Sequence, residues 1–161
     1  MRADDLGKLV LRLTVGGLML FHGINKLQTG VTGIEGMVTA EGLPSWIAYG
    51  VYAAEIIAPI LIILGWGTRV GAGLIMVDMI AAILLVHAAD LTMISERGGA
   101  WAVELPMFYL LTSLALLIMG PGAYSLAGTR VRKPVIIRAP RRERVKERQY
   151  PTPPPSPTVT Y

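Results

Sequence analysis

Residues 6–27, LGKLVLRLTVGGLMLFHGINKL, form a long apolar stretch that carries ionisable side chains near its end. His22 and Lys26 are four residues apart, so in a helix both side chains lie on one face. About 20 apolar residues is the length that a helix needs to cross the hydrocarbon core of a bilayer. The stretch therefore predicts a membrane-spanning helix with a polar stripe in its second half.

Three further apolar stretches follow, at residues 46–65, 70–89 and 102–119. Charged residues are only 16% of the chain, against about 25% in typical soluble proteins. None of the stretches alternates as a barrel strand does, and within lipid only helices and closed barrels satisfy the backbone. The sequence predicts an all-α integral membrane protein, a bundle of four transmembrane helices within residues 1–128.

The connections and the tail differ in character from the spans. Residues 28–45 are expected to be the longest loop, because four glycines and a proline interrupt them. Residues 129–161 are basic and proline-rich, so we expect a disordered tail that contacts anionic lipid head groups. No basic patch is interleaved with aromatic residues, so we expect no nucleic-acid partner. The chain has no cysteine, so any electrons must come through a bound cofactor or a partner.

The distribution of basic residues predicts an orientation. Nine Lys and Arg residues between 130 and 161 place the C-terminus in the cytoplasm by the positive-inside rule. An even number of spans then places the N-terminus on the same side. We expect a multi-pass protein of a bacterial cytoplasmic membrane, with residues 28–45 and 90–99 facing outward.

Ionisable residues within the spans fall into two tiers under this orientation. Charges inside a membrane are costly and mark a function or a pairing. For Arg12, Arg69 and Asp78, in the inner tier, we expect structural ion pairing. The outer tier takes one or two residues from each span: His22, Lys26, Glu55, His87 and Glu104.

Glu55 is the most informative member of the outer tier. It has no cation nearby in sequence, and Pro59, four residues later, lacks the N–H that its carbonyl needs in an α-helix. Either Glu55 is a neutral acid hydrogen-bonded across helices, or it belongs to a proton or ligand site near Lys26 or a histidine. In the same way, Lys26 can extend to the interface, and His87 and Glu104 can be interface residues. No closely spaced pair of metal ligands occurs, so we expect no metal site.

An ordered set of motifs resembles the DoxX family over about residues 9–126. The set comprises LRLTVGGLMLFHGINKL at 11–27, Glu55, GWGTR at 65–69, His87, WAVEL at 101–105 and GPGAYSL at 120–126. The resemblance implies a small bacterial four-helix membrane protein. It also implies a link to sulfur-compound oxidation, as a membrane subunit of a thiosulfate:quinone oxidoreductase, or to oxidative-stress defence.

Two hypotheses of function follow. In the first, the chain is a quinone-facing subunit of a redox complex whose electrons come from a soluble partner protein. Glu55, His22 and Lys26 are its candidate catalytic residues, and the histidines donate hydrogen bonds to quinone carbonyls. The candidate quinone-binding residues are His22, His87, Glu55 and Glu104. In the second hypothesis, the chain is a non-enzymatic carrier, which would require a homo-oligomer, or an assembly scaffold.

Overall fold

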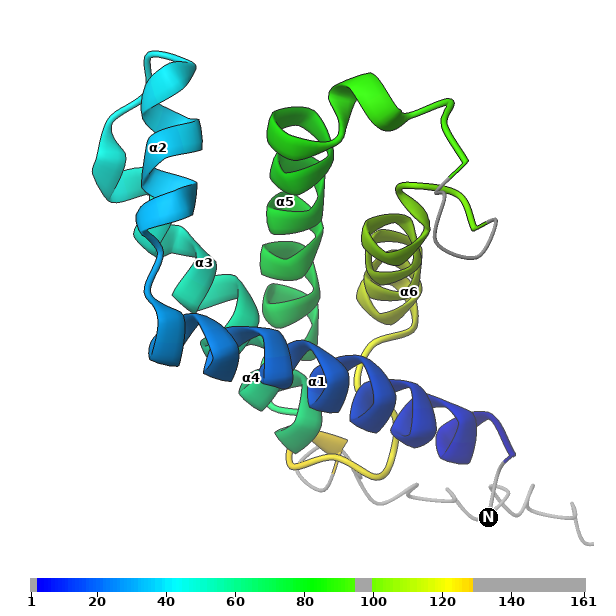
Figure 1. The fold of residues 1–161 in the computed structure, drawn as a ribbon. Coiled ribbons are helices and arrows are strands. Elements are labelled where there is room, and N and C mark those ends of the chain that lie inside the picture. Colours follow the sequence, from blue (N-terminus) through cyan, green and yellow to red (C-terminus); the bar gives the residue numbers. More distant parts are fainter. Residues whose placement is uncertain (1–2, 95–99, 129–161) are drawn as a thin grey trace, which may run out of the picture.

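The computed structural model describes residues 3–94 and 100–128, and the chain is helical over most of this range (Figure 1). The tail predicted to be disordered lies outside the described residues. An isolated bridge between Ile94 and Trp101 is the one extended pairing within the described residues. The elements are α1 (Ala3–Thr29), α2 (Thr32–Ala40), η1 (Ser45–Tyr49), α3 (Gly50–Tyr52), η2 (Ala53–Ile57), α4 (Ala58–Leu64), α5 (Thr68–Val86), η3 (Ala88–Asp90) and α6 (Glu104–Met119).

The four predicted spans are helical, which confirms the all-α fold class. Three helical stretches are long and apolar enough, by length and composition, to cross a membrane: Ala3–Thr29, Ser45–Leu64 and Thr68–Val86. The fourth helix, α6, is equally apolar but has 16 residues. At 1.5 Å per residue it is about 24 Å long, shorter than the ~30 Å hydrocarbon core. The chain is a helical membrane protein whose last span is short.

The prediction of a loop over residues 28–45 was wrong in its middle, where α2 forms. Val31 and Val38 are buried on one side of this segment, while Gly33 and Gly36 face open space. Burial of the apolar side therefore outweighs the roughly 1 kcal/mol that each helical glycine costs. Gly30, with φ +79°, and Gly42, with φ +74°, flank α2 in the left-handed region that favours glycine.

The segment from η2 to α4 forms the centre of the bundle. Glycines on both neighbouring helices allow close backbone contact with it, and Ala58 at its middle is fully buried. A Cβ on Gly16 of α1 would lie 3.1 Å from the carbonyl oxygen of Pro59. A Cβ on Gly71 of α5 would lie 2.7 Å from the carbonyl oxygen of Ala58. Small residues thus set the spacing of α1, α4 and α5.

The predicted ion pairing of Arg12 and Arg69 with Asp78 was wrong. Within the described residues, neither arginine forms an ion pair with Asp78, which lies in a pocket near Lys26. Arg12 instead donates hydrogen bonds to four carbonyl oxygens: Ile62 (2.7 Å), Ile63 (2.6 Å), Pro121 (2.9 Å) and Tyr124 (2.7 Å). The last carbonyls of a helix such as α4 have no partner within it, so a buried guanidinium satisfies them.

The start of α1 and the segment after α6 lie at the same end of the bundle. The backbone N–H of Ala123 donates to Oδ1 of Asp5 over 3.0 Å. Arg12 joins the same segment to the end of α4. The start of the first span and the segment after the fourth therefore meet, which is consistent with an even number of crossings. Which side of the membrane this end faces stays a prediction.

Candidate functional site

Glu55 lies in the middle of the bundle within a π-helical turn. The turn, η2, spans Ala53–Ile57, and Glu55 is 4% exposed. A π turn bonds residue i to residue i+5, so it bypasses the missing N–H of Pro59 four residues after Glu55. Single π turns inside helices are frequent at functional sites. The backbone irregularity that the proline predicts is therefore present at the position of Glu55.

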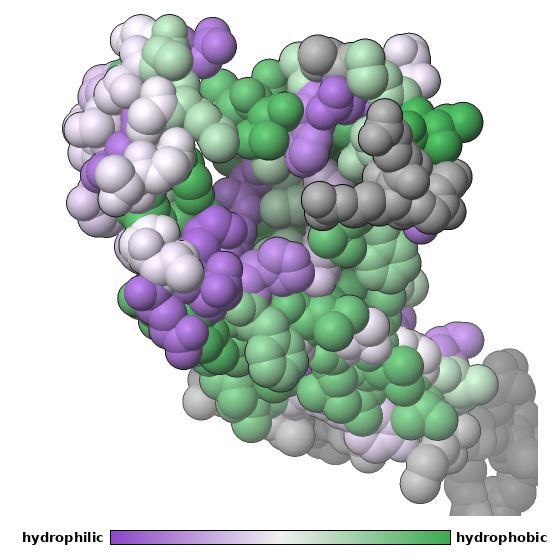
Figure 2. All heavy atoms as spheres, viewed as in Figure 1, coloured by the Kyte–Doolittle hydropathy of each residue, from purple (hydrophilic) through white to green (hydrophobic). Residues whose placement is uncertain are grey.

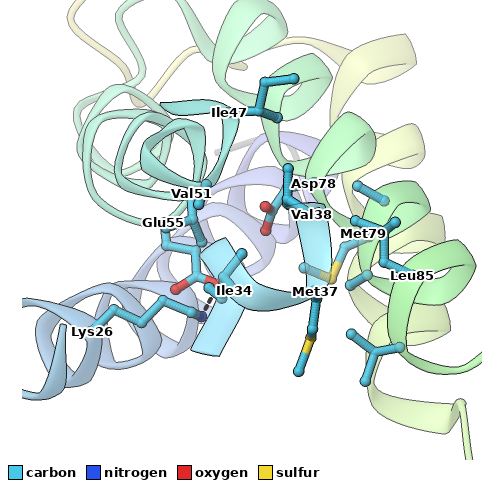
Figure 3. Close-up of a pocket in the computed structure, with 14 residues that line it drawn as sticks. Lys26, Ile34, Met37, Val38, Ile47, Val51, Glu55, Asp78, Met79 and Leu85 are labelled. Atoms are coloured by element: carbon cyan, nitrogen blue, oxygen red, sulfur yellow. Dashed lines mark hydrogen bonds and ion pairs between the residues drawn. The ribbon is translucent and has the colours of Figure 1, made fainter. Parts of the chain in front are cut away.

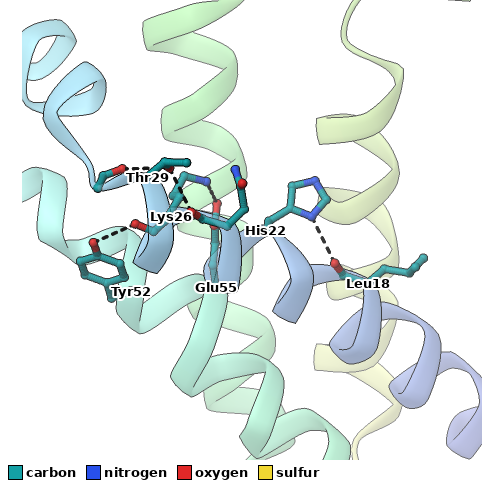
Figure 4. Close-up of polar contacts among 8 residues, drawn as sticks. Leu18, His22, Lys26, Thr29, Tyr52 and Glu55 are labelled. Carbon is teal, nitrogen blue, oxygen red and sulfur yellow. Dashed lines mark hydrogen bonds and ion pairs between the residues drawn. The ribbon is translucent and has the colours of Figure 1, made fainter.

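Gly23 brings α1 against the backbone of this turn. A Cβ at Gly23 would collide with the carbonyl oxygen of Glu55 and would lie 2.6 Å from Cγ1 of Ile56. Tyr52, one residue before η2, donates its hydroxyl to the carbonyl oxygen of Lys26 over 3.2 Å (Figure 4). These two contacts fix the second half of α1 beside the carboxyl group of Glu55.

Lys26 and Glu55 form an ion pair at this crossing. Nζ of Lys26 lies 2.5 Å from Oε1 of Glu55 (Figures 3 and 4). The side chains of Lys26 and Glu55 are 24% and 5% exposed. Oε2 of Glu55 is buried and has no hydrogen-bond partner within the described residues. The charges of Lys26 and Glu55 thus compensate each other, while Oε2 of Glu55 remains an unused hydrogen-bond acceptor.

Two pockets adjoin the ion pair. The larger has a volume of about 260 Å³, and the smaller about 170 Å³. Lys26, Glu55, Met79 and Ala82 line both pockets. The larger is also lined by Ile34, Met37, Val38, Ile47, Ala48, Val51, Asp78, Ala81, Leu85 and Val86, and the smaller by Met19, His22, Leu105, Pro106 and Tyr109.

The surface is hollowed at the same place. Figure 2 shows a recess between α2 and α5, with hydrophilic atoms gathered where the second half of α1 passes below it. Apolar side chains of α2, η1 and α5 form most of the lining of the larger pocket. The site thus combines an apolar cavity with a few charged groups, as small-molecule sites do.

His22 lines the smaller pocket, and one of its ring nitrogens is engaged within α1. Its Nδ1 lies 3.1 Å from the carbonyl oxygen of Leu18, and because a carbonyl only accepts, Nδ1 carries the hydrogen (Figure 4). In the neutral ring, Nε2 is then an acceptor. The ring meets Tyr109 edge to face at 5.7 Å. In this tautomer the one N–H of the neutral ring is already used, and donation from His22 to a bound carbonyl stays a prediction.

His87 and Glu104 line neither pocket. His87 is the residue after α5, and its Nδ1 lies 3.6 Å from Oδ2 of Asp90. Glu104 is the exposed first residue of α6. The structure brings His22, Lys26 and Glu55 together and leaves these two predicted residues outside the pockets.

Asp78 is the residue of the site that sequence reasoning misplaced. It lines the larger pocket with Lys26 and Glu55, although the inner tier was expected to hold it. A usable signal was present: Asp78 is eight residues from the end of α5, and Glu55 is ten residues after Ser45. Antiparallel helices at those counts place both carboxylates at similar depth. Tyr109 and the lining residues of α2 carried no comparable signal.

The fold and site define a class of protein: a helical membrane protein with an ion pair buried between two pockets. The DoxX family model matches residues 7–88, about half of the chain. The chain belongs to the DoxX family, as its motifs indicated.

Two bacterial relatives match most of the chain. The chain is 34% identical over 119 residues to a protein of Bacillus subtilis named putative oxidoreductase CatD, covering 74% of this chain and 83% of that protein. It is 33% identical over 119 residues to an uncharacterised protein of Haemophilus influenzae, covering 72% of this chain and 84% of that protein. No solved structure matches the chain.

Proposed function

We propose that the chain is the membrane component of a quinone-linked oxidoreductase and that the quinone ring binds beside Lys26 and Glu55. The observation that carries the proposal is the buried ion pair between two largely apolar pockets, with Oε2 of Glu55 unused among the described residues. The redox class is supported by the name of the Bacillus subtilis relative. Sulfur-compound metabolism and oxidative-stress defence are two settings in which such a component would act.

The residues present fit a quinone ring. A quinone requires an apolar slot and hydrogen-bond donors for its carbonyl oxygens. The ammonium of Lys26 has three N–H donors, of which Glu55 uses one. The larger pocket, at about 260 Å³, is near the lower end of the roughly 300–1,000 Å³ of small-molecule sites. It therefore suits a single substituted ring whose tail extends into the bilayer.

Each polar residue has a distinct part in this proposal. A bound quinone would supply an acceptor for two electrons and two protons. Lys26 donates a hydrogen bond to a carbonyl oxygen and favours negative charge there. Glu55 holds Lys26 in place and exchanges a proton through Oε2, while the free Nε2 of His22 accepts protons at the smaller pocket. Electrons come from a partner protein, since the cysteine-free chain has no dithiol.

Quinone binding by the purified chain tests the proposal. We expect a short-chain ubiquinone to bind the full chain in lipid nanodiscs, measured by quenching of tryptophan fluorescence. Glu55→Gln and Lys26→Met should each weaken binding about tenfold or more, because each removes a charged hydrogen-bonding group. Glu104→Gln is the matched control, since Glu104 lies outside both pockets.

The contradicting outcomes are equally direct. Absence of ubiquinone binding to the wild-type chain would exclude the proposed site. Equal weakening by Glu55→Gln and Glu104→Gln would assign the effect to surface charge. Circular dichroism of each variant shows whether it is folded, so loss of binding is not confused with loss of structure.

The cellular setting is part of the proposal. We place the chain in a bacterial cytoplasmic membrane with both termini in the cytoplasm, where the basic residues between 130 and 161 contact anionic lipid head groups. Two observations support this placement. Both relatives are bacterial, and the start of α1 and the segment after α6 meet at one end of the bundle.

A further inference from the structure

We infer that the larger pocket prefers the reduced, dihydroxy form of the ring, the quinol, over the oxidised quinone. This inference rests on the proposed function and specifies which form of the ligand the site holds more tightly. It depends on the balance of hydrogen-bond donors and acceptors that the described residues present to the pocket.

Three elements present ionisable groups to the larger pocket. They are Lys26 from α1, Glu55 from η2 and Asp78 from α5, whereas α2 and η1 contribute apolar side chains to its lining. Lys26 is already engaged with Oε1 of Glu55. Two carboxyl groups therefore face one ammonium, which is paired with only one of them.

Both carboxylates have unused acceptor capacity. Oε2 of Glu55 is buried without a hydrogen-bond partner in the described part of the chain. The carboxylate of Asp78 makes neither a hydrogen bond nor an ion pair with any described residue. In Figure 3 it points from α5 toward the side of the pocket where Glu55 lies. A ligand in the larger pocket would therefore meet an unpaired carboxyl oxygen from each of these two residues.

The chemistry of the two ring forms differs at this point. A quinone carbonyl only accepts hydrogen bonds, so it can use Lys26 but leaves the buried Oε2 of Glu55 without a donor. A quinol has two hydroxyl groups, which can donate to Oε2 of Glu55 and to Asp78. Hydrogen bonds between a hydroxyl and a carboxylate are short and strong, and an unmet buried acceptor is costly. The same apolar lining accommodates either ring, so the hydroxyls decide the preference.

A comparison of three ligands tests this inference. Binding of a short-chain ubiquinone, its quinol and the dimethyl ether of that quinol is measured anaerobically with the full chain in nanodiscs. We expect the quinol to bind about tenfold more tightly than the quinone, the effect of one charge-assisted hydrogen bond. The dimethyl ether, which has no O–H donor, should bind no better than the quinone.

Variants assign the preference to its residues. Asp78→Asn should lower the ratio of quinone to quinol dissociation constants, because it replaces one of the two acceptors by an amide that also carries N–H donors, whereas Glu104→Gln should leave the ratio unchanged. Equal binding of quinol and quinone by the wild-type chain would overturn the inference and leave the proposed function standing. A ratio in Asp78→Asn equal to that of the wild-type chain would also overturn it.

Two further outcomes distinguish failure of the proposed function from failure of the quinol preference. Binding of neither ring form would overturn the proposed function together with the inference. If Asp78→Asn does not fold, the dimethyl ether decides on the wild-type chain alone. Binding of the ether as tightly as the quinol would attribute the preference to apolar packing rather than to hydroxyl donors.

Discussion

Lys26 and Glu55 show how two charged side chains can be held inside an apolar helical bundle. A charge within a membrane is costly unless it is paired, and Nζ of Lys26 lies 2.5 Å from Oε1 of Glu55. The glutamate is nearly fully buried, whereas a quarter of the lysine side chain is exposed. Loss of the ion pair is therefore more costly for Glu55, whose charge would stay buried without a partner, than for Lys26, whose charge is partly solvated.

A double-mutant cycle on this pair is the first prediction. Lys26→Met should lower the free energy of unfolding by about 3 kcal/mol, because it leaves the carboxylate of Glu55 buried and uncompensated. The double variant Lys26→Met with Glu55→Leu should regain part of that loss. Unfolding by SDS, followed by circular dichroism, gives the four free energies. Additive effects of the two substitutions would show that the ion pair contributes nothing.

At the scale of elements, contact between backbones positions the site. Gly23 of α1 faces the carbonyl oxygen of Glu55 within the π turn, so the helices approach as closely as their main chains allow. Gly17, on the same helix, has no atom near its Cβ position. The two glycines therefore have different roles although both occur in one apolar stretch.

Substitution of these glycines gives the second prediction. Gly23→Ala should cost about 1–3 kcal/mol of stability, because the new methyl group meets backbone that cannot yield. It should also weaken ligand binding, since it separates Lys26 from Glu55. Gly17→Ala, the matched control, should leave binding unchanged and stability equal or slightly higher. Thermal unfolding and the quinone-binding assay check both variants, and equal behaviour of the two would refute the contact.

At the scale of the whole molecule, Arg12 joins segments far apart in sequence. Arg12 is 1% exposed, and its side chain connects the end of α4 to Pro121 and Tyr124. These two residues follow Arg12 by more than 100 positions in the sequence. The fork of a guanidinium can reach several carbonyl oxygens at once, which an ammonium cannot do. This contact closes one end of the bundle.

Replacement of this arginine by lysine is the third prediction. Arg12→Lys should lower the free energy of unfolding by about 2–3 kcal/mol, since hydrogen bonds of a charged donor are lost and carbonyl oxygens are left unpaired. Arg69→Lys provides the control, because Arg69 is exposed and makes no ion pair within the described ranges. A comparable loss of stability in both variants would contradict the proposed role of Arg12.

The orientation in the membrane yields the fourth prediction. The chain has no cysteine, so a single introduced cysteine reports its own side of the membrane. An impermeant maleimide added to intact cells should label Glu41→Cys, which lies after α2, and should not label Asp4→Cys. After the membrane is permeabilised, both should react. Labelling of Asp4→Cys in intact cells would reverse the predicted orientation.

The fold was largely predictable because helices in lipid must satisfy their own backbone, so apolar length reveals them. The predicted span at residues 46–65 corresponds closely to Ser45–Leu64. The helix at Thr32–Ala40 was not predictable in this way, because its glycines argue against a helix and only burial of Val31 and Val38 supports one. Hydropathy identifies the segments that cross the bilayer, but it gives little information on how a helix outside those segments packs.

The candidate site was predictable in part, because some of its features depend on one helix alone. Spacing placed His22 and Lys26 on one face, and depth placed Glu55 near them, because both are properties of single helices. The sequence alone thus determined four apolar helices, their family and the similar depth of Glu55, His22 and Lys26. Only the tertiary structure decided that Asp78 adjoins this pair, that Arg12 binds carbonyl oxygens, and that His87 and Glu104 line neither pocket. Those outcomes depend on how each helix is rotated about its axis, which contacts between helices determine and hydropathy does not encode.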